Sequence, residues 1–174
     1  MLTLTSELLE SASGLPEPIA VMVVAMIPIA ELRLAIPFAI APPMLGGLGM
    51  APVEAFIFAI LGNLIPVPFL LKLLEPVSSW LRRFRYWERF FDWLFERTRK
   101  RSEAKYERYG LLALCMFVAI PLPFTGAWTG TVVASLFNVD FFKALGAIAA
   151  GVLIAGVLVT LLSTGVLSVA NLYV

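Results

Sequence analysis

The stretch I-P-I-A-E-L-R-L-A-I-P at residues 27–37 places two charged side chains, Glu31 and Arg33, inside a strongly apolar segment. Ionised groups at membrane depth cost about 2.5–3.5 kcal/mol each on insertion scales, so they normally face protein or water and lie on a functional pathway. Pro28 and Pro37 flank the two charges, and we expect the backbone to break there. A broken backbone within a bilayer is tolerated only where it is buried in protein or lines a polar cavity. The stretch therefore predicts a transport site.

Composition narrows the class of protein. Of the 174 residues, 60% are hydrophobic and 14% are charged. In soluble domains, about 45–50% of the residues are apolar and about 25% are charged. A soluble fold would lack polar surface, so we expect an all-α integral membrane protein. The single cysteine, Cys115, excludes a disulfide framework, and there is no histidine to act as a metal ligand or a general base. Without a phosphate loop, a catalytic triad or a metal-ligand cluster, we expect neither enzyme activity nor a cofactor.

Apolar segments separated by Pro- and Gly-rich turns divide most of the chain. Residues 17–41 are long enough for a full span. The prolines and the charge pair favour instead a re-entrant helical hairpin, which enters and leaves on the same side. Residues 110–136 are also interrupted by prolines and give a second hairpin. Residues 52–74 and 140–168 indicate two transmembrane helices.

The segment 76–108 has a different character. Eleven of the thirteen Lys and Arg residues lie between Lys72 and Arg108. Apolar side chains recur there at spacings of three and four, at Trp80, Phe84, Trp87, Phe91 and Leu94. The pattern predicts an amphipathic helix at the membrane interface with its arginines toward anionic lipid headgroups, or alternatively a solvated helical linker. Nucleic-acid binding is not expected, because both flanks are committed to the bilayer.

Charge distribution suggests an orientation. The positive-inside rule places 76–108 in the cytoplasm of a multi-pass cell-membrane protein. Two hairpins and two spans would put both termini outside, whereas four full spans would put both inside. The N-terminal segment 1–16 is weakly amphipathic, an interfacial helix or a frayed tail, and no basic residue precedes Arg33. That composition fits an outside N-terminus and argues against a cleaved signal peptide.

The two halves resemble each other in the order of their elements. Each has an Ile-Pro break, a turn, and a span that opens with a hydrophobic–acidic pair, Val53-Glu54 or Val139-Asp140. We expect these two acidic residues to be helix N-terminal charges. Hairpins that enter from opposite sides would make the halves inverted repeats, an architecture common among secondary transporters.

The candidate site combines both hairpins. Arg33 offers a planar fork of donors for phosphate or carboxylate, and Glu31 in a low dielectric can take up and release protons. The alternative is a buried ion pair that fixes the hairpin tip. Asn63 either holds the backbone or faces the cavity, and Trp128 either lines the cavity or packs. The predicted substrate or ion pathway comprises Glu31, Arg33, Pro37, Asn63, Pro121, Pro123, Thr125, Gly126 and Trp128.

Three motifs carry a family resemblance: E-L-R-L-A-I-P at 31–37, G-N-L-I-P-V-P at 62–68 and P-L-P-F-T-G-A-W-T-G at 121–130. They resemble the small multidrug export protein family, which is similar to the DedA (SNARE-associated, or VTT) superfamily. The resemblance implies two re-entrant hairpins of opposite orientation. It also implies translocation of lipid carriers such as undecaprenyl phosphate, with Glu31 and Arg33 in proton-motive coupling. The chain departs from the DedA pattern at 116–126, which lacks the usual arginine.

Together these features predict an ion-coupled transporter or flippase for a small amphipathic anionic or lipid-like substrate, such as a polyprenyl phosphate or a phospholipid. Protons or sodium would be the coupling ion, and a chain this small is expected to form a homodimer. One alternative is efflux of small cationic drugs through Glu31. Another is a non-transporting membrane scaffold that uses 76–108 to recruit anionic lipid.

Overall fold

The computed structural model describes residues 15–81, 103–122 and 125–170. These residues are mostly helical and contain no strand, which confirms the all-α prediction for this part of the chain. In chain order the elements are α2 (Glu17–Met26), α3 (Glu31–Ile40), the 3-10 helix η1 (Pro43–Leu45), α4 (Pro52–Leu64), α5 (Pro66–Leu81), α7 (Glu103–Ala119), α8 (Ala127–Leu136) and α9 (Phe141–Ala170).

Prolines determine where α2 begins and ends. Pro18 lies in its first turn, where the missing N–H group is not needed. The helix stops before Pro28, because a proline disfavours the helical conformation of the residue before it. That residue, Ile27, is extended, with φ −75° and ψ 130°. The chain therefore breaks between α2 and α3 at the first proline of the charged stretch, as the sequence predicts.

The second predicted break, at Pro37, is wrong, because α3 continues through Pro37 to Ile40. The proline ring removes only the N–H group that would bond the carbonyl of Arg33 four residues earlier. Hydrogen bonds on both sides remain: the N–H of Leu34 donates to Ala30 O at 3.1 Å, and the N–H of Ala41 donates to Pro37 O at 2.9 Å. The loss of one bond leaves the helix continuous.

Two helical segments are long and apolar enough to cross a membrane, Pro52–Leu74 and Phe141–Ser168. The first joins α4 to α5 through Ile65, whose φ of −53° and ψ of −49° are helical. Pro66 then takes the first position of α5, where it is tolerated. By length and composition, these segments agree with the spans predicted at 52–74 and 140–168.

The start of α9 shows the role expected of Asp140. Its carboxylate oxygen Oδ1 accepts hydrogen bonds from the N–H groups of Phe142 and Lys143, at 3.1 and 3.3 Å. Asp140 therefore caps a helix N-terminus.

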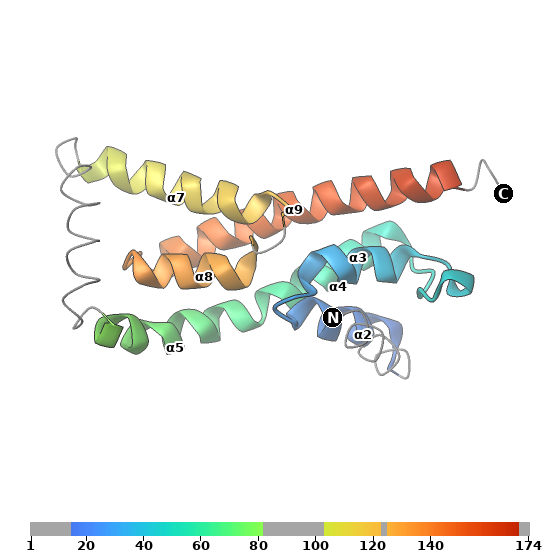
Figure 1. Cartoon of the computed structure of the whole chain (residues 1–174), viewed down its shortest axis with the longest axis horizontal. Coiled ribbons are helices and arrows are strands. Elements are labelled where there is room, and N and C mark those ends of the chain that lie inside the picture. Colours follow the sequence, from blue (N-terminus) through green and yellow to red (C-terminus); the bar gives the residue numbers. More distant parts are fainter. Residues whose placement is uncertain (1–14, 82–102, 123–124, 171–174) are drawn as a thin grey trace.

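Two helical hairpins, α2–α3 and α7–α8, lie at opposite ends of the described part of the molecule (Figure 1). α2 packs on α4, and α7 packs on α9. The second helix of each hairpin contacts both long helical units: α3 lies against α4 and α9, and α8 lies against α5 and α9. Because each hairpin turns near the middle of the long axis, the start of α3 and the start of α8 meet there (Figure 1).

Glycines allow the long helices to approach the hairpins closely. A Cβ atom added at Gly62 of α4 would overlap the backbone of Met22 in α2. One added at Gly151 of α9 would lie 2.6 Å from the carbonyl oxygen of Cys115 in α7. In each half of the chain, a glycine therefore brings a long helix against the first helix of the preceding hairpin.

Part of the predicted interfacial helix 76–108 is described. α5 runs to Leu81 and α7 begins at Glu103. Residues 82–102 lie outside the described residues, as do residues 1–14 of the predicted N-terminal segment. The interfacial position of both segments stays a prediction.

Candidate functional site

Glu31 is the first residue of α3 and has an unusual backbone. Its φ is 45°, in the left-handed region that costs a residue with a Cβ atom about 1–2 kcal/mol. Its side chain is 7% exposed, and it is the only charged side chain among the buried residues that the structure describes. Strained backbone of this kind persists only where the surrounding structure holds it in place, and it is frequent at functional sites.

The Glu31 carboxylate lies at the N-terminus of α8, in the other hairpin. The backbone N–H of Trp128, the second residue of α8, donates to Glu31 Oε1 at 3.3 Å. The positive end of a helix dipole favours a negative charge there. Gly126 makes room for it: its φ of 155° and ψ of −167° suit glycine alone, and a Cβ atom would overlap the carboxylate.

Arg33 also reaches across to the second hairpin. Its Nη2 donates to Thr125 Oγ1 at 3.0 Å. The turn fixes that hydroxyl oxygen, which accepts from the N–H of Leu122 at 3.2 Å and lies 2.7 Å from Ile120 O, an acceptor for its proton. A guanidinium has five N–H donors. Within the described residues Arg33 uses one of them, for Thr125.

The two charges therefore join the hairpins. Glu31 has its partner at Trp128 and Arg33 has its partner at Thr125. The two side chains are two positions apart and need not face one another in a helix, but they do attract each other electrostatically. A buried ion pair that fixes the first hairpin tip therefore stays the alternative interpretation.

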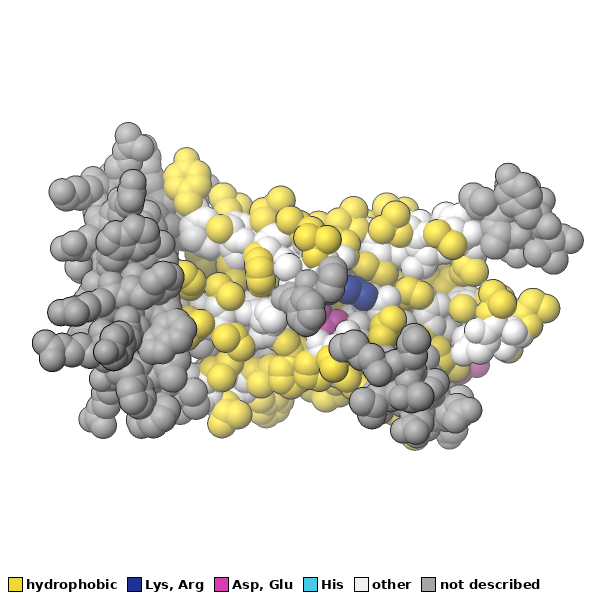
Figure 2. Space-filling model, in the orientation of Figure 1, with side chains coloured by type: hydrophobic (Ala, Val, Ile, Leu, Met, Phe, Trp, Pro, Cys, Tyr) yellow, Lys and Arg dark blue, Asp and Glu magenta, His cyan; other side chains and the backbone are white. Residues whose placement is uncertain are grey.

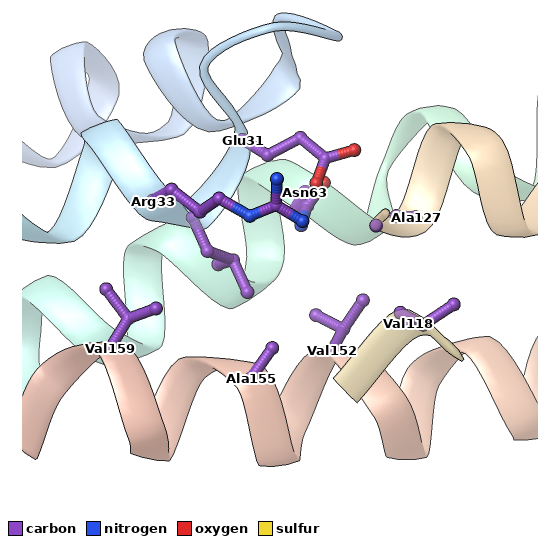
Figure 3. Close-up of a pocket in the computed structure, with 10 residues that line it drawn as sticks. Glu31, Arg33, Asn63, Val118, Ala127, Val152, Ala155 and Val159 are labelled. Atoms are coloured by element: carbon purple, nitrogen blue, oxygen red, sulfur yellow. The ribbon is translucent and has the colours of Figure 1, made fainter. Parts of the chain in front are cut away.

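A small cavity lies between these groups, with room for about one water molecule. Glu31, Arg33 and Asn63 are its polar lining residues (Figure 3). In Figure 3 the Glu31 and Arg33 side chains extend toward Ala127 at the start of α8, and Asn63 of α4 lies beside them. The opposite wall is apolar and belongs mainly to α9, at Val152, Ala155 and Val159.

The other predicted residues have different positions. Trp128 is not part of the cavity lining, and its indole Nε1 donates to Met26 O at 3.1 Å, which ties α8 to the end of α2. Pro37 and Pro121 also lie outside the lining, within α3 and in the turn after α7. Pro123 lies outside the described residues.

Sequence reasoning missed the α9 wall. Val152, Ala155 and Val159 recur at spacings of three and four, so they share a helix face. They differ in no chemical respect from the other apolar residues of α9. Only the packing of α3 on α9 shows which face of that helix meets the site.

Residues 31–158 match the family model described as small multi-drug export protein. The match begins at Glu31 and includes both hairpin tips and Asn63. It covers well over half of the chain.

The chain belongs to the small multi-drug export family. The predicted family is thereby confirmed, whereas the wider likeness to the DedA superfamily stays a prediction. No curated protein and no solved structure matches the chain. Membership in an export family and two apolar helices of spanning length together indicate a membrane protein.

Proposed function

We propose that this protein is an ion-coupled membrane transporter for an amphipathic substrate with an anionic group, such as a lipid phosphate. The observation that carries the proposal is Arg33, a partly exposed guanidinium at the junction of the two hairpin tips. Its planar donors suit phosphate or carboxylate.

The surroundings of Arg33 favour a substrate with an apolar part. Figure 2 shows basic and acidic side chains together near the middle of this face, with hydrophobic side chains around them. Arg33 and Glu31 are the charged residues at the hairpin tips, which lie at that level (Figures 1 and 3). A cation that faces lipid tails costs about 2.5–3.5 kcal/mol. An anionic headgroup that enters from the bilayer would remove this cost, and its chains would stay in apolar surroundings.

The lengths of α2 and α3 support a re-entrant first hairpin. α2 and α3 have 10 residues each, so each rises about 15 Å, half of a hydrocarbon core of about 30 Å. A hairpin of such helices would turn near the midplane. We propose that the two hairpins enter from opposite sides as inverted repeats, with the basic segment between α5 and α7 in the cytoplasm.

Transport would require the hairpin tips to separate. The cavity holds about one water molecule, whereas drug-sized ligands occupy pockets of about 300–1,000 Å³. The Arg33–Thr125 and Glu31–Trp128 hydrogen bonds close the site. Exchanging these bonds for bonds to substrate would open a path between the hairpins.

The test is transport by reconstituted protein. Vesicles with the wild-type chain should move a labelled lipid phosphate across the bilayer, and Arg33→Ala should abolish the movement. Arg33→Lys should retain part of it, because lysine keeps the charge but loses the planar fork. Lys72→Ala is the matched control, since Lys72 is exposed, lies 5.7 Å from the Phe141 ring centroid, and is not at the site. Equal rates in wild type and Arg33→Ala would refute the proposal.

Export of small cationic drugs is the second candidate, favoured by the description of the family. Glu31 would bind the cation, but Arg33 in the same cavity would repel it. This function predicts drug resistance on overexpression that disappears in Glu31→Gln. Resistance that survives in that variant would count against it.

A further inference from the structure

Asn63 has a buried side-chain oxygen that plays no part in the transport proposed above. The residue is 1% exposed and lines the cavity with Glu31 and Arg33 (Figure 3). Its side-chain oxygen Oδ1 has no hydrogen-bond partner among the described residues. Burying a carbonyl oxygen without a donor is unfavourable. A donor should therefore reach Asn63 Oδ1 in at least one state of the transport cycle.

The cavity wall offers two polar side chains besides Asn63. One N–H group of Arg33 donates across the site to Thr125, and the proposed function assigns its other N–H groups to the anionic substrate. Glu31 Oε1 accepts the N–H of Trp128, and an ionised carboxylate has no proton to give. A protonated Glu31, in contrast, carries one O–H donor.

We propose that Asn63 is a positioning residue for the proton on Glu31, and that the neutral carboxyl donates its O–H to Asn63 Oδ1. The inference rests on the proposed function, since it identifies the proton as the coupling ion and Asn63 as its second contact. The step involves proton binding alone. A proton from water adds to a carboxylate oxygen of Glu31, and it returns to water when the site opens on the other side.

The chemistry of the lining favours a proton over a metal cation. Hard cations take about six or more oxygen ligands. Side-chain oxygens in the cavity come from Glu31 and Asn63, and the Arg33 cation shares the same wall. No group of three or more His, Cys, Asp or Glu residues in the described chain could hold a metal ion. A proton needs only a single acceptor.

The remaining groups around Glu31 are few. α4 contributes Asn63 to the site, and α8 contributes the backbone N–H of Trp128 near its N-terminus. α9 contributes the apolar residues Val152, Ala155 and Val159. Glu17 of α2 lies in the exposed first turn of that helix. Among the residues that line the cavity, Arg33 is thus the only other charged one.

Proton binding then couples to the anion. With Glu31 ionised, its charge offsets that of Arg33 at the tip. With Glu31 neutral and bonded to Asn63, the charge of Arg33 is uncompensated and attracts an anionic headgroup more strongly. By linkage, the bound anion strengthens proton binding to the same degree.

The test is a pH titration of the Glu31 carboxyl by infrared difference spectroscopy, on the full chain in lipid nanodiscs. The C=O band that disappears in Glu31→Gln identifies the group. In Asn63→Leu the proton affinity of Glu31 should fall about fivefold, a shift of roughly 0.7 pH units, because the neutral carboxyl loses its acceptor. Asn63→Gln keeps an amide and should recover part of the affinity.

A control variant separates this role from a structural one. Thr131→Val removes a buried hydroxyl that donates to Ala127 O within α8 at 2.6 Å and is not part of the lining, so the Glu31 titration should not change. If Asn63→Leu does not fold, Asn63→Ala replaces it as the variant whose Glu31 titration is measured. A wild-type titration in these Asn63 variants would overturn the proposal and assign Oδ1 to water alone. If the wild type moves no lipid phosphate, the proposed function fails, and the titration still decides whether Asn63 contacts the proton.

Discussion

Glu31 combines a left-handed backbone, burial and a bond to another hairpin. Its φ is 45°, and its carboxylate accepts from the N-terminal turn of α8. These features are mutually dependent. The left-handed residue starts α3 directly after the turn, the carboxylate reaches α8, and Gly126 leaves space for it. The strain at one residue is thus repaid by contacts across the junction.

Gly126→Ala should disturb this junction. Alanine would be forced into a backbone conformation that costs about 1–3 kcal/mol, and its Cβ atom would displace the Glu31 carboxylate. We expect lower thermal stability in detergent and loss of transport. Gly146→Ala is the matched control, since no atom lies within 4 Å of the added Cβ atom. Equal stability of the two variants would show that Glu31 does not depend on Gly126.

At the scale of the elements, the long helices depend on glycine for close packing. α4 lies against α2 at Gly62, and α9 lies against α7 at Gly151, with no space for a Cβ atom at either contact. Small residues commonly allow such close approach between membrane helices. The first helix of each hairpin therefore packs on the long helix of its own half, while the second helix contacts the long helices of both halves.

Gly62→Ala and Gly151→Ala should each destabilise the protein, by about 1–3 kcal/mol, as overpacking does in other cores. The measurement is unfolding in detergent or lipid. Gly165→Ala is the control, because its added Cβ atom meets nothing within 4 Å. If all three variants unfold alike, the helices are not packed as closely as the structure has them.

The sequence predicts the helical fold of the described residues and both long helices, because the apolar runs and the prolines carry that information. It also predicts the break at Pro28. It fails at Pro37, because a helix can lose one hydrogen bond and continue when its neighbours hold it. It fails at Val152, Ala155 and Val159 as well, since apolar residues become a site wall only through tertiary packing.

The partners of Glu31 and Arg33 could not be predicted from spacing. Trp128 lies 97 residues from Glu31 along the chain, and Thr125 lies 92 residues from Arg33, both in the second hairpin. Charge and burial indicate that such residues need partners, but they do not say which segment supplies them. Dimerisation and binding of anionic lipid by 76–108 stay predictions.

At the scale of the whole molecule, we propose that the two hairpins enter the membrane from opposite sides, so that the tips that meet in the structure lie near its midplane. Single cysteines in a Cys115→Ser background can test this with a membrane-impermeant thiol reagent. Leu15, before α2, and Asn138, between α8 and α9, are both exposed, and Met44, 88% exposed between α3 and α4, is the control. We predict labelling of Leu15→Cys and Met44→Cys on intact cells, and of Asn138→Cys only after permeabilisation. Labelling of Asn138→Cys on intact cells, with Leu15→Cys protected, would mean four plain spans and would contradict the meeting of two re-entrant tips.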